Sequence, residues 1–274
     1  DIPYLPIRFF KSHTIQSFKG KPVKTFTSSG TTTSINAQHH LADLSNYRGS
    51  FQACFEQFYG KPKDWAILAL LPSYLEREGS SLIYMMDSLI AQSKNEHSGF
   101  YLADLAKLNA LLLELEQQKQ PTLLLGVSFA LLDFTEQYSL NLSSTTVMDT
   151  GGMKGRRKEL TREELHKTLQ KGFGVSAIHS EYGMTELLSQ AYAKGDGRFH
   201  CPNWMRVTPF ETNDPFAPTE EGKIGRLNII DLANQESCAF IATDDLGRSF
   251  PDGTFEVMGR LDASDIRGCN LLVY

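Results

Sequence analysis

The sequence is poor in cysteine, which limits the kinds of site it can build. Its four cysteines are widely spaced and include no Cys-x-x-Cys pair; they are Cys54, Cys201, Cys238 and Cys269. This spacing argues against a zinc site and against a dense disulfide framework. We therefore expect reduced thiols and a cytoplasmic protein.

The chain also lacks a surplus of positive charge and a long apolar run. A net charge of −5 and a pI near 5.8 do not give the basic footprint of a nucleic-acid partner. Apolar stretches such as residues 65–71 are too short to cross a membrane. We expect neither a nucleic-acid nor a membrane partner. The chain begins at Asp1 with no initiator Met and no signal peptide, so we expect further residues upstream of it.

What is present is an ordinary globular composition. The 274 residues are 41% hydrophobic and 22% charged, which argues against disorder. This length allows one large domain with a small appendage.

Apolar runs that read as strands alternate with helical patterns over the first two-thirds of the chain. We expect strands at residues 24–27, 65–71, 122–127, 145–149 and 177–180, and helices at 37–59, 81–93, 102–118, 129–138 and 161–169. The alternation predicts an α/β fold with a largely parallel sheet flanked by helices. The first fifteen residues read as an extended segment across the core.

The last third has a different pattern. Short strands are expected at residues 222–231, 239–242, 254–258 and 271–274, separated by turns, after a polar connector at 211–221. We therefore predict two units, an α/β nucleotide- and acyl-binding core over residues 1–210 and a β-rich subdomain over 211–274.

Two polar segments of the first unit have residues suited to a nucleotide. Residues 27–34 read TSSGTTTS and follow a predicted strand; hydroxyls and N–H groups around a glycine can cradle phosphates. The alternative is a flexible Ser/Thr loop, and the G-K-[ST] ending of a Walker loop is absent. Residues 182–186 read YGMTE, where a Tyr can stack on a base and a Glu can hold Mg²⁺. The alternative there is a strand-to-helix turn with a surface Glu.

Two more such segments lie in the predicted β-rich unit. Residues 243–248 read TDDLGR, and paired Asp residues at a strand end can accept hydrogen bonds from ribose hydroxyls. A solvated turn is the alternative. Residues 259–262 read GRLD, whose Arg can bind phosphate or ribose, or form a surface salt bridge worth little.

In this order the four motifs resemble those of the adenylate-forming enzymes, which include acyl-CoA synthetases, luciferases and peptide-synthetase adenylation domains. The resemblance spans residues 26–265. Within the superfamily the chain is most similar to the acyl-protein synthetases of bacterial bioluminescence and to phenylacetate-CoA ligases. The segments that carry this closer likeness are the opening IPYLPIRFFK at 2–11, GGMKG at 151–155 and RGC at 267–269.

The resemblance implies the large-domain fold of that superfamily, with ATP and Mg²⁺ as cofactors. It assigns the ATP phosphates to Ser28, Ser29, Gly30, Thr31 and Thr32. It assigns the adenine pocket and its surroundings to Gly151, Gly152, Tyr182 and Gly183. Thr185 would approach the α-phosphate, Glu186 would hold Mg²⁺, Asp245 would bind the ribose, and Arg260 would lie near the nucleotide at the hinge.

Two departures from the family pattern shape the expectations. Thr33 stands where a Gly is usual after the second Thr of the phosphate loop. The chain also ends soon after the hinge motif, so we expect the mobile C-terminal domain and its Lys to be absent or vestigial, which puts the use of CoA in question.

Two residues are candidates for a source of positive charge and for an acyl acceptor. Lys154, beside Arg156 and Arg157, is a hypothetical source of positive charge during adenylation; a basic solvated loop is the alternative. Cys269, near Arg267, is a hypothetical acyl acceptor, because a neighbouring cation lowers a thiol pKa; a small apolar residue of a terminal strand is the alternative.

The leading interpretation is ATP-dependent activation of a carboxylic, by resemblance fatty, acid as its acyl-adenylate, with acyl transfer to a protein thiol. The alternatives are a CoA ligase or acyltransferase that uses a partner thiol, and a degenerate nucleotide-binding scaffold. An acyl-acceptor or reductase partner follows by analogy only. Apolar runs near residues 68–71, 81–86 and 123–127 can line an acyl tunnel or form sheet core. The pair His39 and His40 reads as solvated or capping at a helix start, and His179 receives no catalytic role.

Overall fold

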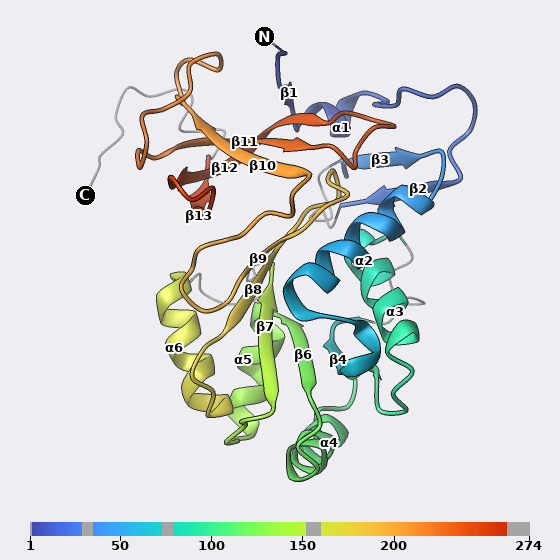
Figure 1. Cartoon of the computed structure of the whole chain (residues 1–274), viewed down its shortest axis with the longest axis vertical. Coiled ribbons are helices and arrows are strands. Elements are labelled where there is room, and N and C mark those ends of the chain that lie inside the picture. Colours follow the sequence, from blue (N-terminus) through green and yellow to red (C-terminus); the bar gives the residue numbers. More distant parts are fainter. Residues whose placement is uncertain (1, 29–34, 73–78, 152–159, 262–274) are drawn as a thin grey trace.

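The computed structural model describes residues 2–28, 35–72, 79–151 and 160–261. Its strands form two larger sheets and a separate two-stranded hairpin (Figure 1). Several predicted features lie outside the described residues: the strand at 271–274, most of the Ser/Thr loop (Ser29, Gly30, Thr31 and Thr32), and Gly152, Lys154 and Cys269.

The first sheet has six strands in the order β5-β4-β6-β7-β8-β9. Strands β4 to β8 pair in parallel and β9 pairs antiparallel to β8. The strands are β4 (Ala66–Leu70), β5 (Gly99–Phe100), β6 (Thr122–Val127), β7 (Thr145–Thr150), β8 (His179–Tyr182) and β9 (Ala191–Ala193). Every residue of β4 and of β6 is buried, as expected for parallel strands covered on both faces.

Helices cover this sheet, with α2 and α3 to its right and α5 and α6 to its left in the view of Figure 1. The helices are α2 (Ser45–Tyr59), α3 (Ser81–Ser93), α4 (Leu105–Gln117), α5 (Ser128–Gln137) and α6 (Arg162–Phe173), with a 3₁₀ turn at Pro62–Asp64. Thr161 and Glu164 form the predicted capping box of α6. The predicted α/β class is confirmed, and among the described residues no helix is long and apolar enough to span a membrane.

The second sheet draws its strands from both ends of the chain. It contains β1 (Leu5–Pro6), β10 (Met205–Phe210), β11 (Gly225–Asp231), β12 (Phe240–Ser249) and β13 (Phe255–Arg260). Strand β1 pairs in parallel with β12, with Leu5 opposite Ile241, and the short helix α1 (Phe9–Ser12) follows it. The opening segment is therefore an edge of this sheet, and β10 pairs with β11 although the predicted division assigns the two strands to different units.

The start of the predicted helix 37–59 is instead a strand. Strand β3 (Gln38–Leu41) pairs antiparallel with β2 (Lys24–Thr27), and α2 begins only at Ser45. His39 and Leu41 are buried on the same side of β3, a period of two that the helical spacing of the later residues obscured. The predicted solvated histidine pair is wrong for His39, which is fully buried.

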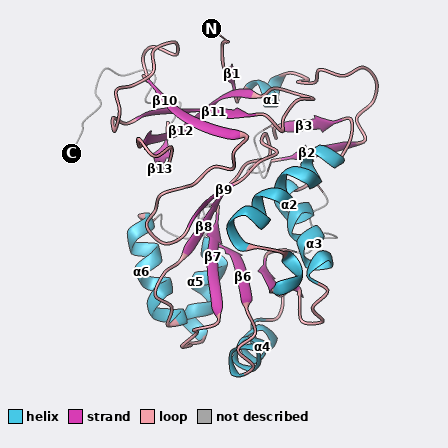
Figure 2. Cartoon of the chain, in the orientation of Figure 1, coloured by secondary structure: helices cyan, strands magenta, loops and turns pink. Residues whose placement is uncertain are grey.

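Two motif environments also differ from the sequence prediction (Figure 2). Residues 243–248 lie inside β12, which continues to Ser249, so the two Asp residues are not at a strand end. Residues 183–186 begin the connection from β8 to the antiparallel strand β9; this connection spans residues 183–190 and contains no helix. The β8–β9 connection places the motif where the two larger sheets meet.

Candidate active site

A cleft of about 220 Å³ brings together residues from three motif regions of the sequence. It is lined by Ile7, Arg8, Lys11, Glu186, Asp244, Arg260 and Leu261. The lining therefore combines two carboxylates with three cations, two from the opening segment and one from β13. This combination suits a ligand that carries phosphates and a metal ion.

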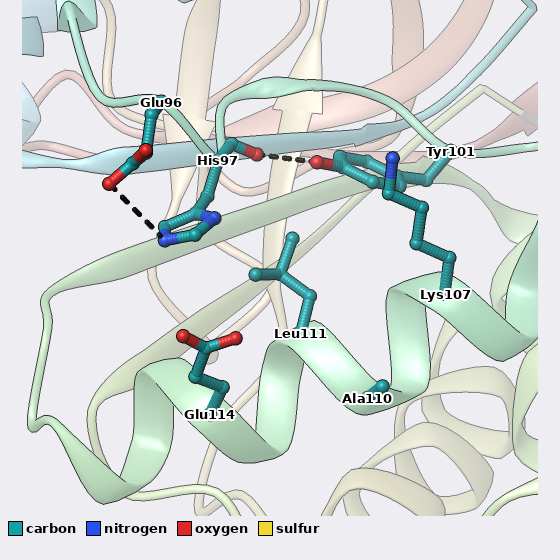
Figure 3. A pocket seen from close by; sticks show the side chains of 7 residues that line it. All are labelled: Glu96, His97, Tyr101, Lys107, Ala110, Leu111 and Glu114. Atoms are coloured by element: carbon teal, nitrogen blue, oxygen red, sulfur yellow. Dashed lines mark hydrogen bonds and ion pairs between the residues drawn. The ribbon is translucent and has the colours of Figure 1, made fainter.

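A second hollow of about 260 Å³ lies away from all four motifs, between α4 and residues 96–101. Figure 3 shows Tyr101 donating a hydrogen bond to the His97 carbonyl oxygen (2.6 Å), with the Lys107 side chain close to its ring. Both residues make local contacts there, and none of the predicted site residues lines this hollow.

Three predicted site residues form one hydrogen-bonded group behind the cleft. The Tyr182 hydroxyl donates to Asp245 Oδ2 (2.8 Å), and Arg260 Nε donates to Asp245 Oδ1 (2.9 Å). Tyr182 is 9% exposed and its ring packs against Phe199 and Phe255. The group joins β8 of the first sheet to β12 and β13 of the second.

Glu186 presents a buried carboxylate to the cleft. It is 7% exposed, and burial raises its pKa, while Arg260 and Lys11 act in the opposite direction. Among the described residues no side chain donates a hydrogen bond to this carboxylate. A carboxylate that is poorly solvated and faces a cleft fits an oxygen-seeking cation such as Mg²⁺.

Backbone contacts of Thr185 and Glu186 reveal residues that the sequence analysis missed. His39 Nδ1 lies 2.8 Å from the Thr185 carbonyl oxygen, and Asn234 Nδ2 donates to the Glu186 carbonyl oxygen (2.8 Å). Asp231 Oδ2 accepts the backbone N–H groups of Leu188 (2.8 Å) and Ser189. The turn-like sequence after β11 does not indicate that its side chains bind the backbone of residues 185–189. The contacts join segments that are far apart in the chain.

Positive charge from the opening segment was also missed. Arg8 forms an ion pair with Asp244 (3.4 Å), and Arg226 approaches the same carboxylate (3.7 Å). Lys11 is exposed on α1 and lines the cleft. The sequence showed that residues 2–11 resemble a family segment, and the parallel pairing of β1 with β12 brings Arg8 and Lys11 to the site.

The structure explains why glycine occupies two positions of the predicted site. A side chain at Gly183 would place its Cβ 2.3 Å from Glu181 Oε1. Gly151 has a φ of 69°, a left-handed conformation that favours glycine, and its carbonyl accepts a hydrogen bond from Ser128 Oγ (2.9 Å). Gly151 is therefore explained by backbone conformation at the end of β7, and Gly183 by its contact with a buried side chain at the end of β8.

Ser28 closes the base of the Ser/Thr loop. Its Oγ accepts from Ala37 N (2.9 Å), and its own N–H donates to the Ala37 carbonyl (3.1 Å). The two ends of the loop are therefore joined at the mouth of the β2–β3 hairpin, which leads through β3 to His39.

Three other titratable groups, His179, Cys54 and Cys201, do not line this cleft. His179 contacts the Tyr59 hydroxyl (3.1 Å), and burial lowers its pKa to about 4. Burial raises the pKa of the Cys54 and Cys201 thiols to about 12, which keeps them protonated and unreactive. Across the described ranges no group of three His, Cys, Asp or Glu residues is arranged to hold a metal ion.

Comparison with solved structures shows that this chain shares its fold with about half, or less, of three known proteins. ATP-bound MatB from Rhodopseudomonas palustris matches with a TM-score of 0.64 at 16% identity, over 88% of this chain and 49% of that one. The o-succinylbenzoate coenzyme A synthetase MenE of Bacillus subtilis, with ATP and magnesium, matches at 0.60 and 16%, over 86% and 49%. The coronafacic acid ligase of Pectobacterium brasiliense gives 0.55 and 17%, over 82% and 44%.

A curated relative agrees with the narrower resemblance. The long-chain-fatty-acid–luciferin-component ligase of Aliivibrio fischeri is 26% identical over 137 residues, which cover 46% of this chain and 36% of that protein. No protein-family model matches the chain. The resemblance to the adenylate-forming superfamily is thus confirmed, while the chain spans about half the length, or less, of the proteins it matches.

Proposed function

We propose that this chain activates a carboxylic acid with ATP, forming an acyl-adenylate and then passing the acyl group to a thiol. The observation that carries the proposal is the meeting of Glu186, Asp244 and Arg260 with Lys11 and Arg8 around one cleft. Separate motifs converge there on a surface whose charges suit a metal-bound triphosphate. The nucleotide-bound structures with the same fold support this assignment.

In the first step a carboxylate oxygen of the acid attacks the α-phosphorus of ATP. The bond from that phosphorus to the bridging oxygen breaks, and pyrophosphate leaves. In this proposal Lys11 and Arg260, which line the cleft, attract the phosphates, and the Glu186 carboxylate would hold Mg²⁺. Mg²⁺, when bound, neutralises phosphate charge and orients the leaving group.

The second step is attack of a thiolate on the acyl carbonyl carbon, with AMP as the leaving group. Cys269 stays our hypothesis for this thiol, and Lys154 for an added cation; both lie outside the described residues. Among the described thiols, burial leaves Cys54 and Cys201 protonated and poorly suited to the role. A protein-thiol acceptor is favoured by the narrower resemblance alone.

For the nucleotide, we assign the phosphates to the loop that Ser28 closes. We assign the ribose to Asp245. Both oxygens of Asp245 already accept one hydrogen bond each, and a carboxylate has lone pairs for more. Gly151 and Gly183 are proposed to border the adenine by resemblance to the family motifs.

The test is acid-dependent exchange of labelled pyrophosphate into ATP, with Mg²⁺ and acids from acetate and aryl acids to long-chain fatty acids. The name of the curated relative makes a long-chain fatty acid the first to try. Exchange with one acid class establishes adenylation and identifies the substrate. Binding of ATP without exchange for any acid overturns the proposal in favour of a nucleotide-binding scaffold.

The acceptor is tested by mass spectrometry after incubation with the active acid and ATP. An acyl adduct on the wild-type chain that is lost in Cys269→Ser supports self-acylation. An adduct that survives this change excludes Cys269. Release of AMP that depends on added CoA supports a CoA ligase instead.

A further inference from the structure

We propose that His39 and Asn234 are positioning residues that hold the backbone of Thr185 and Glu186 in place for the reaction. We call this pair the carbonyl clamp, because each side chain binds one of two successive carbonyl oxygens. The role of the clamp in catalysis rests on the proposed function. Its contacts do not depend on that function.

The clamp contacts the segment from two different elements. His39 Nδ1 lies 2.8 Å from the Thr185 carbonyl oxygen, and Asn234 Nδ2 lies 2.8 Å from that of Glu186. A carbonyl oxygen can only accept, so the imidazole proton is on Nδ1 and the Asn234 amide nitrogen faces Glu186. Two consecutive peptide groups are therefore fixed immediately beside the side chains that reach the cleft.

The two members of the clamp also lie next to each other, with Ser237 beside both. Asn234 Oδ1 lies 3.1 Å from His39 Nε2, and the Ser237 hydroxyl lies 2.8 Å from Nε2 and 2.6 Å from Oδ1. With the proton on Nδ1 of the neutral ring, Nε2 and Asn234 Oδ1 are both acceptors and do not bond each other. The single Ser237 hydroxyl proton is donated to Asn234 Oδ1. The Ser237 hydroxyl thus fixes the orientation of the Asn234 amide, and the Thr185 carbonyl oxygen fixes that of the His39 ring.

Burial makes the network stiff. His39 and Asn234 are both 0% exposed, and the Phe10 ring packs edge-to-face on the imidazole at 5.6 Å. Water cannot replace a lost contact there, so a broken hydrogen bond leaves a buried polar group without a partner. The Thr185 and Glu186 peptide groups thus have one strongly preferred orientation.

The clamp also connects two parts of the site. His39 lies on β3, the strand that follows the Ser/Thr loop, and its backbone pairs with Phe26 just before that loop. Asn234 lies after β11, where Asp231 holds the N–H groups of Leu188 and Ser189. The loop proposed to hold phosphate and the carboxylate proposed to hold Mg²⁺ are thereby tied to one rigid group.

The experiment compares His39→Asn with His39→Gln, because an Asn amide nitrogen takes the place of Nδ1 whereas that of Gln takes the place of Nε2. His40→Ala is the matched control; His40 is the next residue on the same strand and contacts Thr25 Oγ1 instead (2.8 Å). Asn234→Ala tests the second member of the clamp. Three readouts are used: melting temperature, hydrogen–deuterium exchange of peptides covering residues 182–189, and the kcat and Mg²⁺ dependence of pyrophosphate exchange.

We expect His39→Gln and Asn234→Ala to speed hydrogen exchange in residues 182–189 and to lower kcat or Mg²⁺ affinity about 10- to 100-fold, as for other residues that orient metal-binding groups. His39→Asn should recover most of both losses, and His40→Ala should change neither. The clamp is overturned if His39→Gln and Asn234→Ala match His40→Ala in both readouts, or if Asn and Gln at position 39 behave alike.

The two proposals fail in different ways. If the wild-type chain shows no pyrophosphate exchange, the proposed function fails. Faster hydrogen exchange at residues 182–189 in His39→Gln, restored by His39→Asn, would still support the clamp. If His39→Gln does not fold, the same readouts are compared between Asn234→Ala and His39→Asn.

Discussion

The two larger sheets are assembled in opposite ways. Strands β4, β5, β6, β7 and β8 of the first sheet follow one another along the chain with a helix between each pair, and each is a short apolar or mixed run. The second sheet joins β1, near the start, to β12, far along the chain. The first sheet supplies a packed frame, whereas the second brings charged residues to the frame's edge. The candidate active site lies where they meet.

The largest effect should come from the core of the first sheet. Leu124 lies on β6, is 0% exposed and has buried neighbours on both faces. Leu124→Ala should lower the free energy of unfolding by about 3–4 kcal/mol, because it removes buried methyl groups and leaves a cavity. Urea unfolding followed by circular dichroism measures this change.

Leu113→Ala is the matched control, since Leu113 on α4 is 44% exposed. It should cost less than about 1 kcal/mol. Equal losses at the two positions would contradict the view that the parallel strands carry the stability of the frame.

The second-largest effect should be a loss of reaction rate without a loss of folding stability. Glu186→Gln keeps the shape of the side chain but removes the charge that faces the cleft. We expect a loss of about 10²–10³-fold in pyrophosphate exchange, in the range found when one electrostatic contact to a transition state is removed. Unfolding stability should stay equal or rise, since burial already raises the pKa of this carboxyl.

Glu114→Gln serves as the control, because Glu114 lines the other hollow beside α4. It should leave exchange unchanged. If Glu114→Gln loses as much activity as Glu186→Gln, the active site does not lie where the two larger sheets meet.

A third prediction measures how tightly the two sheets are coupled. Tyr182→Phe removes the hydrogen bond from β8 to Asp245 on β12 and leaves a buried carboxylate oxygen with one donor fewer. We expect a loss of about 2 kcal/mol in unfolding free energy. Tyr101→Phe removes a local hydrogen bond to the His97 carbonyl and should cost less. A smaller loss at Tyr182 than at Tyr101 would show that the sheets are only weakly coupled.

The smallest effect, counted per pH unit, concerns a buried charge inside the first sheet. Glu181 accepts a hydrogen bond from Thr150, and burial raises its pKa from 4.5 to about 7. Between these pH values the folded chain holds a proton that the unfolded chain has released, so this group makes the folded state less stable as pH rises from 4.5 to 7. Glu181→Gln cannot titrate and should gain on wild type by at most about 1.4 kcal/mol per pH unit.

Thermal unfolding at pH 5, 6, 7 and 8 measures the difference between Glu181→Gln and wild type. Glu163→Gln is the control, because Glu163 is exposed and its pKa is lowered by Lys167. A difference for Glu181→Gln that is flat across this range would show that the carboxyl is already ionised at pH 5.

The sequence was sufficient where structure depends on neighbouring residues. The bounds of α3 at Ser81–Ser93 and of β6 at Thr122–Val127 agree with the prediction, because apolar periodicity and flanking Ser and Pro residues are local signals. It failed at β3, where strand pairing with β2 outweighs the helical spacing that continues into α2. Pairing partners are set by the fold, and no short window contains them.

By itself the sequence determined the α/β class, the order of the four motifs and the superfamily that they indicate. The tertiary structure alone decided that Arg8 and Lys11 face Glu186, and that His39 binds the backbone of Thr185. The reason is physical: a hydrophobic pattern records which side of an element is buried, whereas hydrogen bonds and ion pairs between distant segments form only after the sheets have packed.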